Sequence, residues 1–358
     1  YYNHLHALVK QADHPKELNM RIALDAMGSD TCPEPEIAAA AAAVDLFGDE
    51  IYLVGPIGQL KPRLELINAN LKKIVLVDAA DTITMEDKGM ALVLKAKRPS
   101  SKTSMAVGID LVKTGNADAF ITAGNTGGAM TTAYFRLGMI PGAERPALAG
   151  TFPVKSGYCI VLDIGANPDC KPEHLLQFAL MGSVFANKAR HISNPRIAIL
   201  SNGEESGKGN ELVRSTVPLL ANSGLNFIGN VEGKELFGGL ADVVVTDGFT
   251  GNVLLKSSEA VAKLITDTLK EQLKSNPISM LGALLAKPSL KKLKSMMDPD
   301  DVGAAPLLGV NGLVFIGHGR SNSHALVSAI RAARQSIEAR VLDATQAAIL
   351  ESLSKLHN

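Results

Sequence analysis

Residues 159–190 read CIVLDIGANPDCKPEHLLQFALMGSVFANKAR, and this stretch decides the fold class. Its apolar beginning, Cys159–Asp163, has the length and composition of a buried strand. A loop of glycine, asparagine and aspartate follows, and Pro172–Arg190 then begins like a helix, because proline suits the first helical turn. The stretch therefore predicts a strand, a polar loop and a helix in succession.

This succession recurs along the chain. Repeated strand, loop and helix predict an α/β fold, with a largely parallel sheet and helices on both of its faces. An aromatic share of only 4% indicates an aliphatic core, which suits buried parallel strands. We expect further strands at Arg21–Asp25, Ile51–Val54, Ile74–Val77, Ala119–Thr122, Arg196–Leu200, Asn226–Gly229, Asp242–Thr246 and Leu313–Ile316, and further helices at Glu36–Phe47, Ser104–Thr114 and Asn252–Lys274.

The composition argues against several classes of protein. Lysine plus arginine equals aspartate plus glutamate at 36 each, so no basic field indicates a nucleic-acid partner. Cys32, Cys159 and Cys170 are too irregularly spaced for a disulfide framework or a zinc site, and they indicate a reducing compartment. No apolar run reaches the roughly 18 residues that a membrane span needs. We therefore expect a soluble, cytoplasmic protein.

The chain is predicted to form one large unit with two appended segments. The regular pattern begins after Met20, so we interpret residues 1–19 as a leader or upstream read-through, with a native arm as the alternative. Residues 20–342 are expected to form a single α/β unit, and 343–358 a C-terminal helical tail. We see no internal repeat.

Residues 277–297, PISMLGALLAKPSLKKLKSMM, differ from the rest of the chain. They predict a protruding hairpin of two short helices broken at Pro288, the first apolar and the second rich in lysine. An apolar tip beside lysines can lie in the interface of anionic lipids, which makes Leu281, Leu284 and Leu285 candidate membrane contacts. A dimer-packing arm is the alternative.

Polar loops follow the predicted strands, at the strand ends where ligands bind in such folds. Each loop combines glycine with asparagine or aspartate, more than turn chemistry alone requires. The candidate ligand-binding residues in these loops are Asp25, Gly28, Asp30, Gly124, Thr126, Gly127, Asp163, Gly165, Asp169, Lys208, Asp247, Gly248 and Asn252.

The Gly124–Gly128 loop lies where a strand becomes a helix. Glycine there lets the main chain approach a ligand and point N–H groups at an anion, and the helix dipole adds to the attraction. Asn125 can donate to a phosphate or to a developing oxyanion. The alternative is a tight turn with Thr126 as the helix N-cap.

The loop at 163–169 places two carboxylates and the amide of Asn167 within seven residues. These groups can bind a cation, contact a hydroxylated ligand or orient a base; the alternatives are an Asx-turn at Asn167 and a cap at Asp169. Lys171 and His174 follow at the start of the next helix, where they can contact a ligand.

Two later loops repeat this composition. Lys208 lies between two glycines and can contact phosphate, but the spacing GxxxxGK[ST] of an ATP-binding loop is missing. Asn252 either contacts a ligand or caps the long helix that it opens. No GxGxxG follows the first strand, and no GxSxG indicates an acyl-enzyme on serine.

Taken in order, these loops resemble the phosphate acyltransferase family, the PlsX proteins of bacterial phospholipid synthesis. Departures are Ser29, where the family commonly has glycine, and Ser201-Asn202 in the loop before Lys208. The matching stretches are IALDAMGSD (22–30), AGNTGGAM (123–130), ERPALAG (144–150), VLDIGANPDCKPEHLLQFALMGSV (161–184), KGNELV (208–213), NFIGNVEG (226–233), ADVVVTDGFTGNVLLKSSEAVAK (241–263) and GAAPLLGVNGLVFIGHG (303–319).

The resemblance implies a three-layer α/β/α fold like that of isopropylmalate dehydrogenase. It implies that acyl-[acyl carrier protein] and inorganic phosphate are converted to acyl phosphate, without a cofactor or metal, by a homodimer. The product would feed a membrane glycerol-3-phosphate acyltransferase, so peripheral contact with the membrane is expected, and the 277–297 hairpin can also steer the acidic carrier protein.

For this reaction we expect phosphate to attack the thioester directly, because phosphate is a competent nucleophile and a thioester is activated. The enzyme then has to position the reactants and stabilise charge. Glycine-bearing loops around Gly28, Gly124–Gly127 and Gly165 are expected to donate N–H groups to phosphate. Lys171 or Lys208 would neutralise its charge, Asn125 or Asn167 would donate to the oxyanion, and His174 or Lys171 would help the thiolate leave.

Three rival functions use the same loops. A phosphotransacetylase would differ only in using acyl-CoA as the donor. An oxidoreductase of this fold would need a nucleotide site and metal-binding aspartates. A non-catalytic sensor of acyl groups or carrier protein would bind its ligand and release no thiol.

Overall fold

The computed structural model describes residues 19–67, 71–155, 157–296 and 299–356. The chain forms two compact units, where the sequence analysis expected one over 20–342. Unit 1 comprises the chain up to Leu137 together with Gly312–Arg334, and unit 2 comprises Gly138–Asn311 with the chain from Gln335 onward. The predicted leader lies almost wholly outside the described residues.

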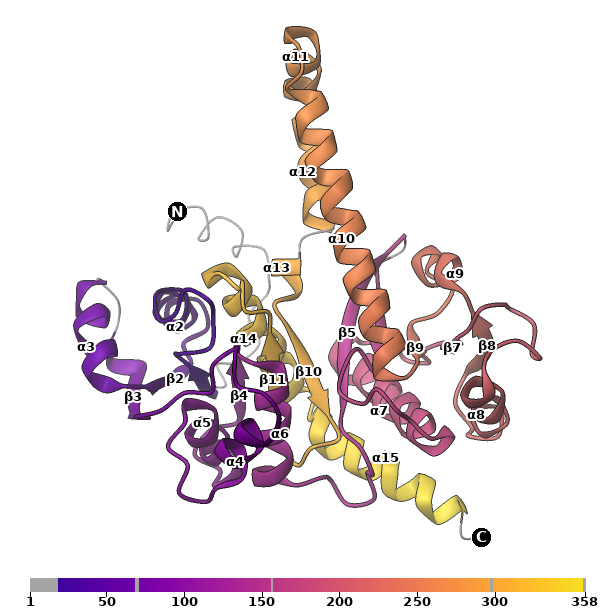
Figure 1. The fold of residues 1–358 in the computed structure, drawn as a ribbon, viewed down its shortest axis with the longest axis horizontal. Coiled ribbons are helices and arrows are strands. Elements are labelled where there is room, and N and C mark those ends of the chain that lie inside the picture. The colour runs from indigo at the N-terminus through magenta and orange to yellow at the C-terminus, as the bar shows by residue number, and fades with distance from the viewer. Residues whose placement is uncertain (1–18, 68–70, 156, 297–298, 357–358) are drawn as a thin grey trace. The chain divides into compact units, whose positions relative to one another are not determined.

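Unit 1 is a parallel sheet in the strand order β3-β2-β1-β4-β11 (Figure 1). β4 and β11 are buried along their whole length, as expected of strands covered on both faces. The strands are β1 (Arg21–Asp25), β2 (Glu50–Gly55), β3 (Ile74–Asp78), β4 (Ala119–Thr122) and β11 (Val314–Gly317). The helices are α2 (Glu34–Phe47), α3 (Ile57–Leu66), η1 (Leu71–Lys73), α4 (Gly89–Lys97), α5 (Ser104–Lys113), α6 (Thr126–Leu137) and α14 (Ser323–Glu338), whose last residues belong to unit 2.

Unit 2 has the strand order β10-β5-β6-β9-β7-β8, with β5 antiparallel to both of its neighbours and the other pairs parallel. Its core forms where α7 packs on the sheet through Phe178, Met181 and Phe185. The strands are β5 (Ala147–Val154), β6 (Gly157–Leu162), β7 (Ile197–Leu200), β8 (Phe227–Val231), β9 (Val243–Val245) and β10 (Ala304–Leu308). The helices are α7 (Pro172–Arg190), α8 (Glu211–Ala221), α9 (Gly233–Gly238), α10 (Gly248–Leu273), α11 (Pro277–Leu285), α12 (Lys287–Met296), α13 (Pro299–Val302) and α15 (Val341–Leu356).

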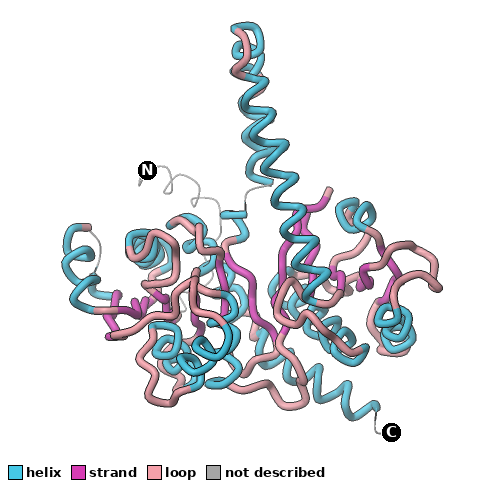
Figure 2. The backbone as a smooth tube through the Cα atoms, viewed as in Figure 1, coloured by secondary structure: helices cyan, strands magenta, loops and turns pink. Residues whose placement is uncertain are grey.

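The predicted α/β class is confirmed, because mostly parallel strands are flanked by helices (Figure 2). Every predicted strand and helix is present, with ends that differ by a few residues, and α15 occupies the predicted C-terminal tail. β5 and β10 were not predicted. Each contains a proline, Pro153 in β5 and Pro306 in β10, and proline inside an apolar run weakens a strand signal.

A helical hairpin projects from unit 2. α10 is 26 residues long, and only Gly248 and Gly251 are buried in it (Figure 1). α11 and α12 are the two predicted short helices, but the chain breaks at Ala286 rather than at Pro288. Pro288 lies in the first turn of α12, where its missing N–H has no partner to lose.

Candidate active site

In unit 2, one buried carboxylate holds the loop that follows β6. Asp163 is fully buried, and its oxygens accept five N–H hydrogen bonds of 2.6 to 3.1 Å. Four come from the main chain at Leu148, Gly165, Ala166 and Asn167, and the fifth comes from the Asn167 side chain. Burial raises the pKa of Asp163, and the hydrogen bonds oppose this effect. Asp163 therefore sets the conformation of the whole loop.

The two donors expected from this loop are already engaged. Asn167 donates its amide hydrogens to the carbonyl of Pro146 at 2.6 Å and to Asp163 at 2.8 Å. The main-chain N–H of Gly165, expected to face phosphate, instead donates to Asp163 at 3.1 Å. Asn167 and Gly165 therefore have a structural role, because a donor in such a network can reach a ligand only by losing its buried hydrogen-bond partner.

The first turn of α10 packs directly on the same loop. The N–H of Gly248 donates to the carbonyl of Asn167 at 2.7 Å. A Cβ atom at Gly248 would lie 2.8 Å from main-chain atoms of Asn167, and one at Gly251 would lie 1.9 Å from the carbonyl oxygen of Asp163. Only glycine permits this approach at either position.

Asp247 is the cap of α10. Its carboxylate accepts from the N–H and the hydroxyl of Thr250, each at 2.8 Å. The sequence alternative, a cap at Asn252, is therefore wrong, since the helix begins at Gly248. Asn252 is exposed, and its side chain is the nearest group to the space in front of Gly165, about 3.9 Å from where a Cβ would lie.

Lys171 and His174 form the first turn of α7. The Nδ1 atom of His174 accepts the main-chain N–H of Lys171 at 3.1 Å, so the other ring nitrogen carries the proton. That Nε2 atom lies 3.2 Å from the carboxylate of Glu144. His174 is thus buried with a defined tautomer, whereas the Lys171 side chain is exposed. Glu144 was not predicted as a site residue; it lies in the quoted stretch ERPALAG.

The remaining predicted residues of unit 2 are exposed. Asp169 lies in the loop between β6 and α7, and it does not cap α7, whose cap is Lys171. Lys208 lies in the loop before α8, where Asn210 caps the helix by accepting from the N–H of Val213. Both side chains are accessible to an anionic or polar ligand.

In unit 1, the loops after β1 and β4 are in close contact. The buried Asp25 carboxylate accepts from the Thr122 hydroxyl at 2.7 Å. The hydroxyl oxygen of Thr122 in turn accepts from the N–H of Gly124 at 3.0 Å. A Cβ at Gly28 would lie 2.9 Å from the main-chain nitrogen of Gly124. Burial raises the pKa of Asp25. Asp30 is exposed, and its N–H donates to the carbonyl of Gly319 at 2.7 Å.

Asn125 is the N-cap of α6. Its side-chain oxygen accepts from the N–H of Gly128 at 2.9 Å, and its amide donates to the carbonyls of Thr84 and Asp87 at 2.9 and 3.1 Å. The alternative interpretation, a cap at Thr126, is therefore wrong, and the amide of Asn125 is engaged by a neighbouring loop. Within the described residues, the N–H groups of Thr126 and Gly127 have no hydrogen-bond partner.

A buried acid, Glu36, supports the loop after β1. Glu36 is fully buried in the first turn of α2 and accepts the main-chain N–H of Ser29 at 3.0 Å. Its second oxygen has no partner among the described residues, and burial raises its pKa to about 7. The burial of Glu36 could not be predicted from the sequence, because an acidic residue in a first helical turn is common on a protein surface.

The variant Glu36→Gln is expected to become more stable than the parent protein as pH rises. The folded-state pKa of Glu36 lies above the value of 4.5 for a free side chain, so the folded state holds more protons between about pH 4.5 and 7 and loses stability across that window. Glutamine removes this loss, so the difference in unfolding free energy should grow by about 3 kcal/mol from pH 5 to pH 8. Urea unfolding at several pH values measures it. Glu34→Gln, on the exposed side of the same turn, is the control, and parallel pH profiles for the two variants would contradict the prediction.

Among the described residues, no group of three or more His, Cys, Asp or Glu side chains is placed to hold a metal ion. None of the helices in the described ranges is long and apolar enough to cross a membrane.

Comparison with known proteins places this geometry in context. Residues 20–344 match the model of a family described as "Fatty acid synthesis protein". The chain is 46% identical over 320 residues to a phosphate acyltransferase of Elusimicrobium minutum, which covers 89% of this chain and 93% of that protein. It is also 46% identical over 321 residues to a phosphate acyltransferase of Acidobacterium capsulatum, covering 89% and 94% of the two chains.

A solved structure shares the fold. A phosphotransacetylase from Streptococcus pyogenes aligns with a TM-score of 0.62 at 17% identity, covering 94% of this chain and 99% of that one. At this level of identity, the likeness concerns the fold alone.

Proposed function

Because the chain belongs to this fatty acid synthesis family and is a phosphate acyltransferase, we propose that it makes acyl phosphate from acyl-[acyl carrier protein] and inorganic phosphate. A phosphate oxygen attacks the thioester carbonyl, the carbon–sulfur bond breaks, and the carrier leaves as a thiolate that takes up a proton. The acyl phosphate then serves phospholipid synthesis.

The observation that carries this proposal is the open first turn of α6. The N–H groups of Thr126 and Gly127 have no partner among the described residues, and both lie at the positive end of a 12-residue helix. A Cβ at Gly127 would meet only the Asn125 side chain, at 3.5 Å, so the space in front of this turn is open. Such a turn binds phosphate without further adaptation.

The cysteines favour direct attack by phosphate over a covalent cysteine intermediate. Burial raises the pKa of Cys159 and of Cys170 to about 12 and that of Cys32 to about 11. A thiol with such a pKa is almost wholly protonated near pH 7 and is a poor nucleophile. Phosphate needs no such activation.

The residues predicted to act in catalysis divide into two kinds. Lys171 and Lys208 are exposed and remain our candidates for neutralising the phosphate charge. Asn125 and Asn167 hold loops through engaged amides, so we now assign them a positioning task. His174 is buried, and its two ring nitrogens contact the Lys171 N–H and the Glu144 carboxylate, so we assign it a positioning task as well; Lys171 stays the candidate for protonating the thiolate.

Release of free thiol tests the function. We expect release from acyl-[acyl carrier protein] only when phosphate is present, and little from acyl-CoA. Release without phosphate would identify a thioesterase, and equal use of acyl-CoA would identify a phosphotransacetylase. Gly127→Ala should raise KM for phosphate about tenfold, since its methyl group covers the open turn. The control is Gly282→Ala, a helical glycine with no neighbour within 4 Å of its added Cβ.

We also propose that the protein is a homodimer that contacts the membrane surface. α10 exposes an apolar stripe with helical spacing, Val261, Leu264 and Ile265, which a second copy can cover. α11 exposes Leu281, Leu284 and Leu285, the predicted membrane contacts, with exposed fractions of 60 to 78%. Contact with lipid would bring acyl phosphate close to a membrane glycerol-3-phosphate acyltransferase.

Vesicle flotation tests the lipid contact. Changing Leu281, Leu284 and Leu285 to glutamate should abolish binding to phosphatidylglycerol vesicles, because three charges cannot enter the apolar interface. Leu350→Glu, at an exposed leucine on α15, should leave binding unchanged. Undiminished flotation of the folded triple variant would exclude α11 as the contact.

A further inference from the structure

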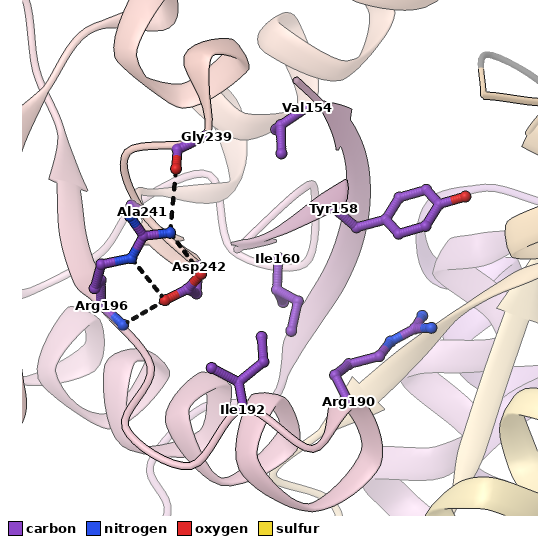
Figure 3. Close-up of a pocket in the computed structure, with 9 residues that line it drawn as sticks. All are labelled: Val154, Tyr158, Ile160, Arg190, Ile192, Arg196, Gly239, Ala241 and Asp242. Atoms are coloured by element: carbon purple, nitrogen blue, oxygen red, sulfur yellow. Dashed lines mark hydrogen bonds and ion pairs between the residues drawn. The ribbon is translucent and has the colours of Figure 1, made fainter. Parts of the chain in front are cut away.

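Unit 2 contains a cavity of about 350 Å³ away from the loops described above (Figure 3). It lies beside Tyr158 and Ile160 of β6, whereas Asp163 and the candidate active-site loop follow the end of that strand. The end of α7 and the segments around Arg196 and Asp242 complete its wall. Its volume is near the lower end for small-molecule pockets, so it suits a small ligand.

One charged pair in the wall is already satisfied. Arg196 donates to both oxygens of Asp242, from Nε at 3.0 Å and from Nη2 at 2.8 Å, and its main-chain N–H donates to the same carboxylate at 2.8 Å. Nη2 also donates to the carbonyl of Gly239 at 3.1 Å. Figure 3 shows these hydrogen bonds among Arg196, Asp242 and Gly239 together on one side of the cavity. The pair leaves no net charge.

The second arginine of the wall, Arg190, has no such partner. No carboxylate of the described residues lies within ion-pair distance, and its polar contact is a marginal 3.5 Å to the Thr151 hydroxyl. The guanidinium carbon lies 6.0 Å from the centre of the Phe185 ring. Arg190 is half-buried, and burial lowers its pKa, so the charge is partly desolvated. A partly desolvated guanidinium without an anion is costly, because arginine cannot become neutral instead.

The rest of the wall is mainly apolar. Val154, Ile160, Ile192 and Ala241 contribute aliphatic side chains. With Arg196 and Asp242 cancelling, the cavity carries one uncompensated positive charge beside an apolar surface. Tyr158 extends to the same side as Arg190 in Figure 3, and the residue is 46% exposed, so a ligand can enter the cavity from this side.

We propose that this cavity binds a monoanion with a short apolar body, namely an alkyl carboxylate of medium length. Arg190 pairs with the carboxylate through two parallel N–H groups, and the alkyl chain lies against Val154, Ile160 and Ile192. A carboxylate matches the planar fork of the guanidinium and supplies one negative charge for the one that is uncompensated.

Titration calorimetry of the full chain with sodium octanoate tests the site. We expect one octanoate per chain, no comparable binding of octylammonium, and an affinity that inorganic phosphate does not reduce. Arg190→Met should weaken octanoate binding about tenfold or more. Lys188→Met removes the same charge from the same last turn of α7 at an exposed position, and it should leave the affinity unchanged. Equal affinity in the Arg190 variant would place octanoate elsewhere and overturn the proposal.

Thermal unfolding without ligand gives a second, independent readout. Arg190→Met should have an equal or higher Tm than the parent protein, because it removes an uncompensated charge. A lower Tm would mean that the guanidinium is paired in the native protein, by this chain or by a second copy, and the proposal would fall. Arg190→Lys retains the charge but not the fork, so it should fold and bind octanoate with reduced affinity.

Discussion

Replacing Asp163 by alanine is expected to lower the free energy of unfolding of unit 2 by about 4 kcal/mol or more and to abolish acyl transfer. The change removes the acceptor of five N–H groups, all of which lie in or beside the loop after β6. A buried donor that loses its partner forfeits its hydration as well as its hydrogen bond, and alanine offers no replacement. The loop then has no single conformation to present to α7 and α10.

The comparison variants separate charge from hydrogen bonding. Asp163→Asn retains one acceptor oxygen but turns an amide N–H₂ toward other donors, so we expect an intermediate loss of stability. Asp169→Ala changes an exposed carboxylate six residues later in the same loop and should leave stability unchanged. Urea unfolding and thiol release measure the two effects. If Asp163→Ala unfolds like the Asp169 variant, the five hydrogen bonds do not hold the loop.

Replacing Gly251 by alanine should be as severe, although it adds only a methyl group. That methyl carbon would lie 1.9 Å from the carbonyl oxygen of Asp163 and 2.9 Å from its carbonyl carbon. Main-chain atoms on a buried strand end cannot rotate away as a flexible side chain can, so α10 must shift off the loop. We expect a loss of about 3 kcal/mol or more in stability and a large loss of activity.

Gly282→Ala is the matched control for this variant. It places the same methyl group inside another helix of unit 2, where nothing lies within 4 Å of the added Cβ. Alanine is the better helix former by about 1 kcal/mol, so this variant should be unchanged or slightly stabilised. Thermal unfolding of the pair gives the comparison. Equal Tm values for the two variants would show that α10 does not pack closely against the loop after β6.

The α/β class and most elements could be predicted from the sequence, because strand and helix signals are local. The run 159–163 and the helix signal that starts at Pro172 each lie within one segment, and both predictions are confirmed. β5 was missed because its pairing is antiparallel and it carries Gly150 and Pro153, which weaken a strand pattern. Its existence depends on β6 and β10 beside it.

The roles of individual side chains depended on residues far along the chain. Asn125 looked like a free donor in its own loop, yet its amide is engaged by carbonyls 38 and 41 positions earlier. Asn167 and Gly165 looked available for phosphate, but Asp163 takes their N–H groups. Buried donors in a folded loop are paired within the protein, so a polar residue at a strand end need not face the ligand.

The alternation of strands and helices, the polar loops at strand ends and the resemblance to phosphate acyltransferases follow from the sequence alone, because each depends on adjacent residues. Which polar groups are engaged inside the protein, and which stay open to a ligand, depends on the tertiary fold. Glu36 and Arg190 resemble ordinary helix-end charges in the sequence. In the fold, Glu36 is a buried acid, and Arg190 is half-buried without an ion-pair partner among the described residues. The solvation of a charged group depends on all the segments that surround it, so a local sequence pattern does not predict it.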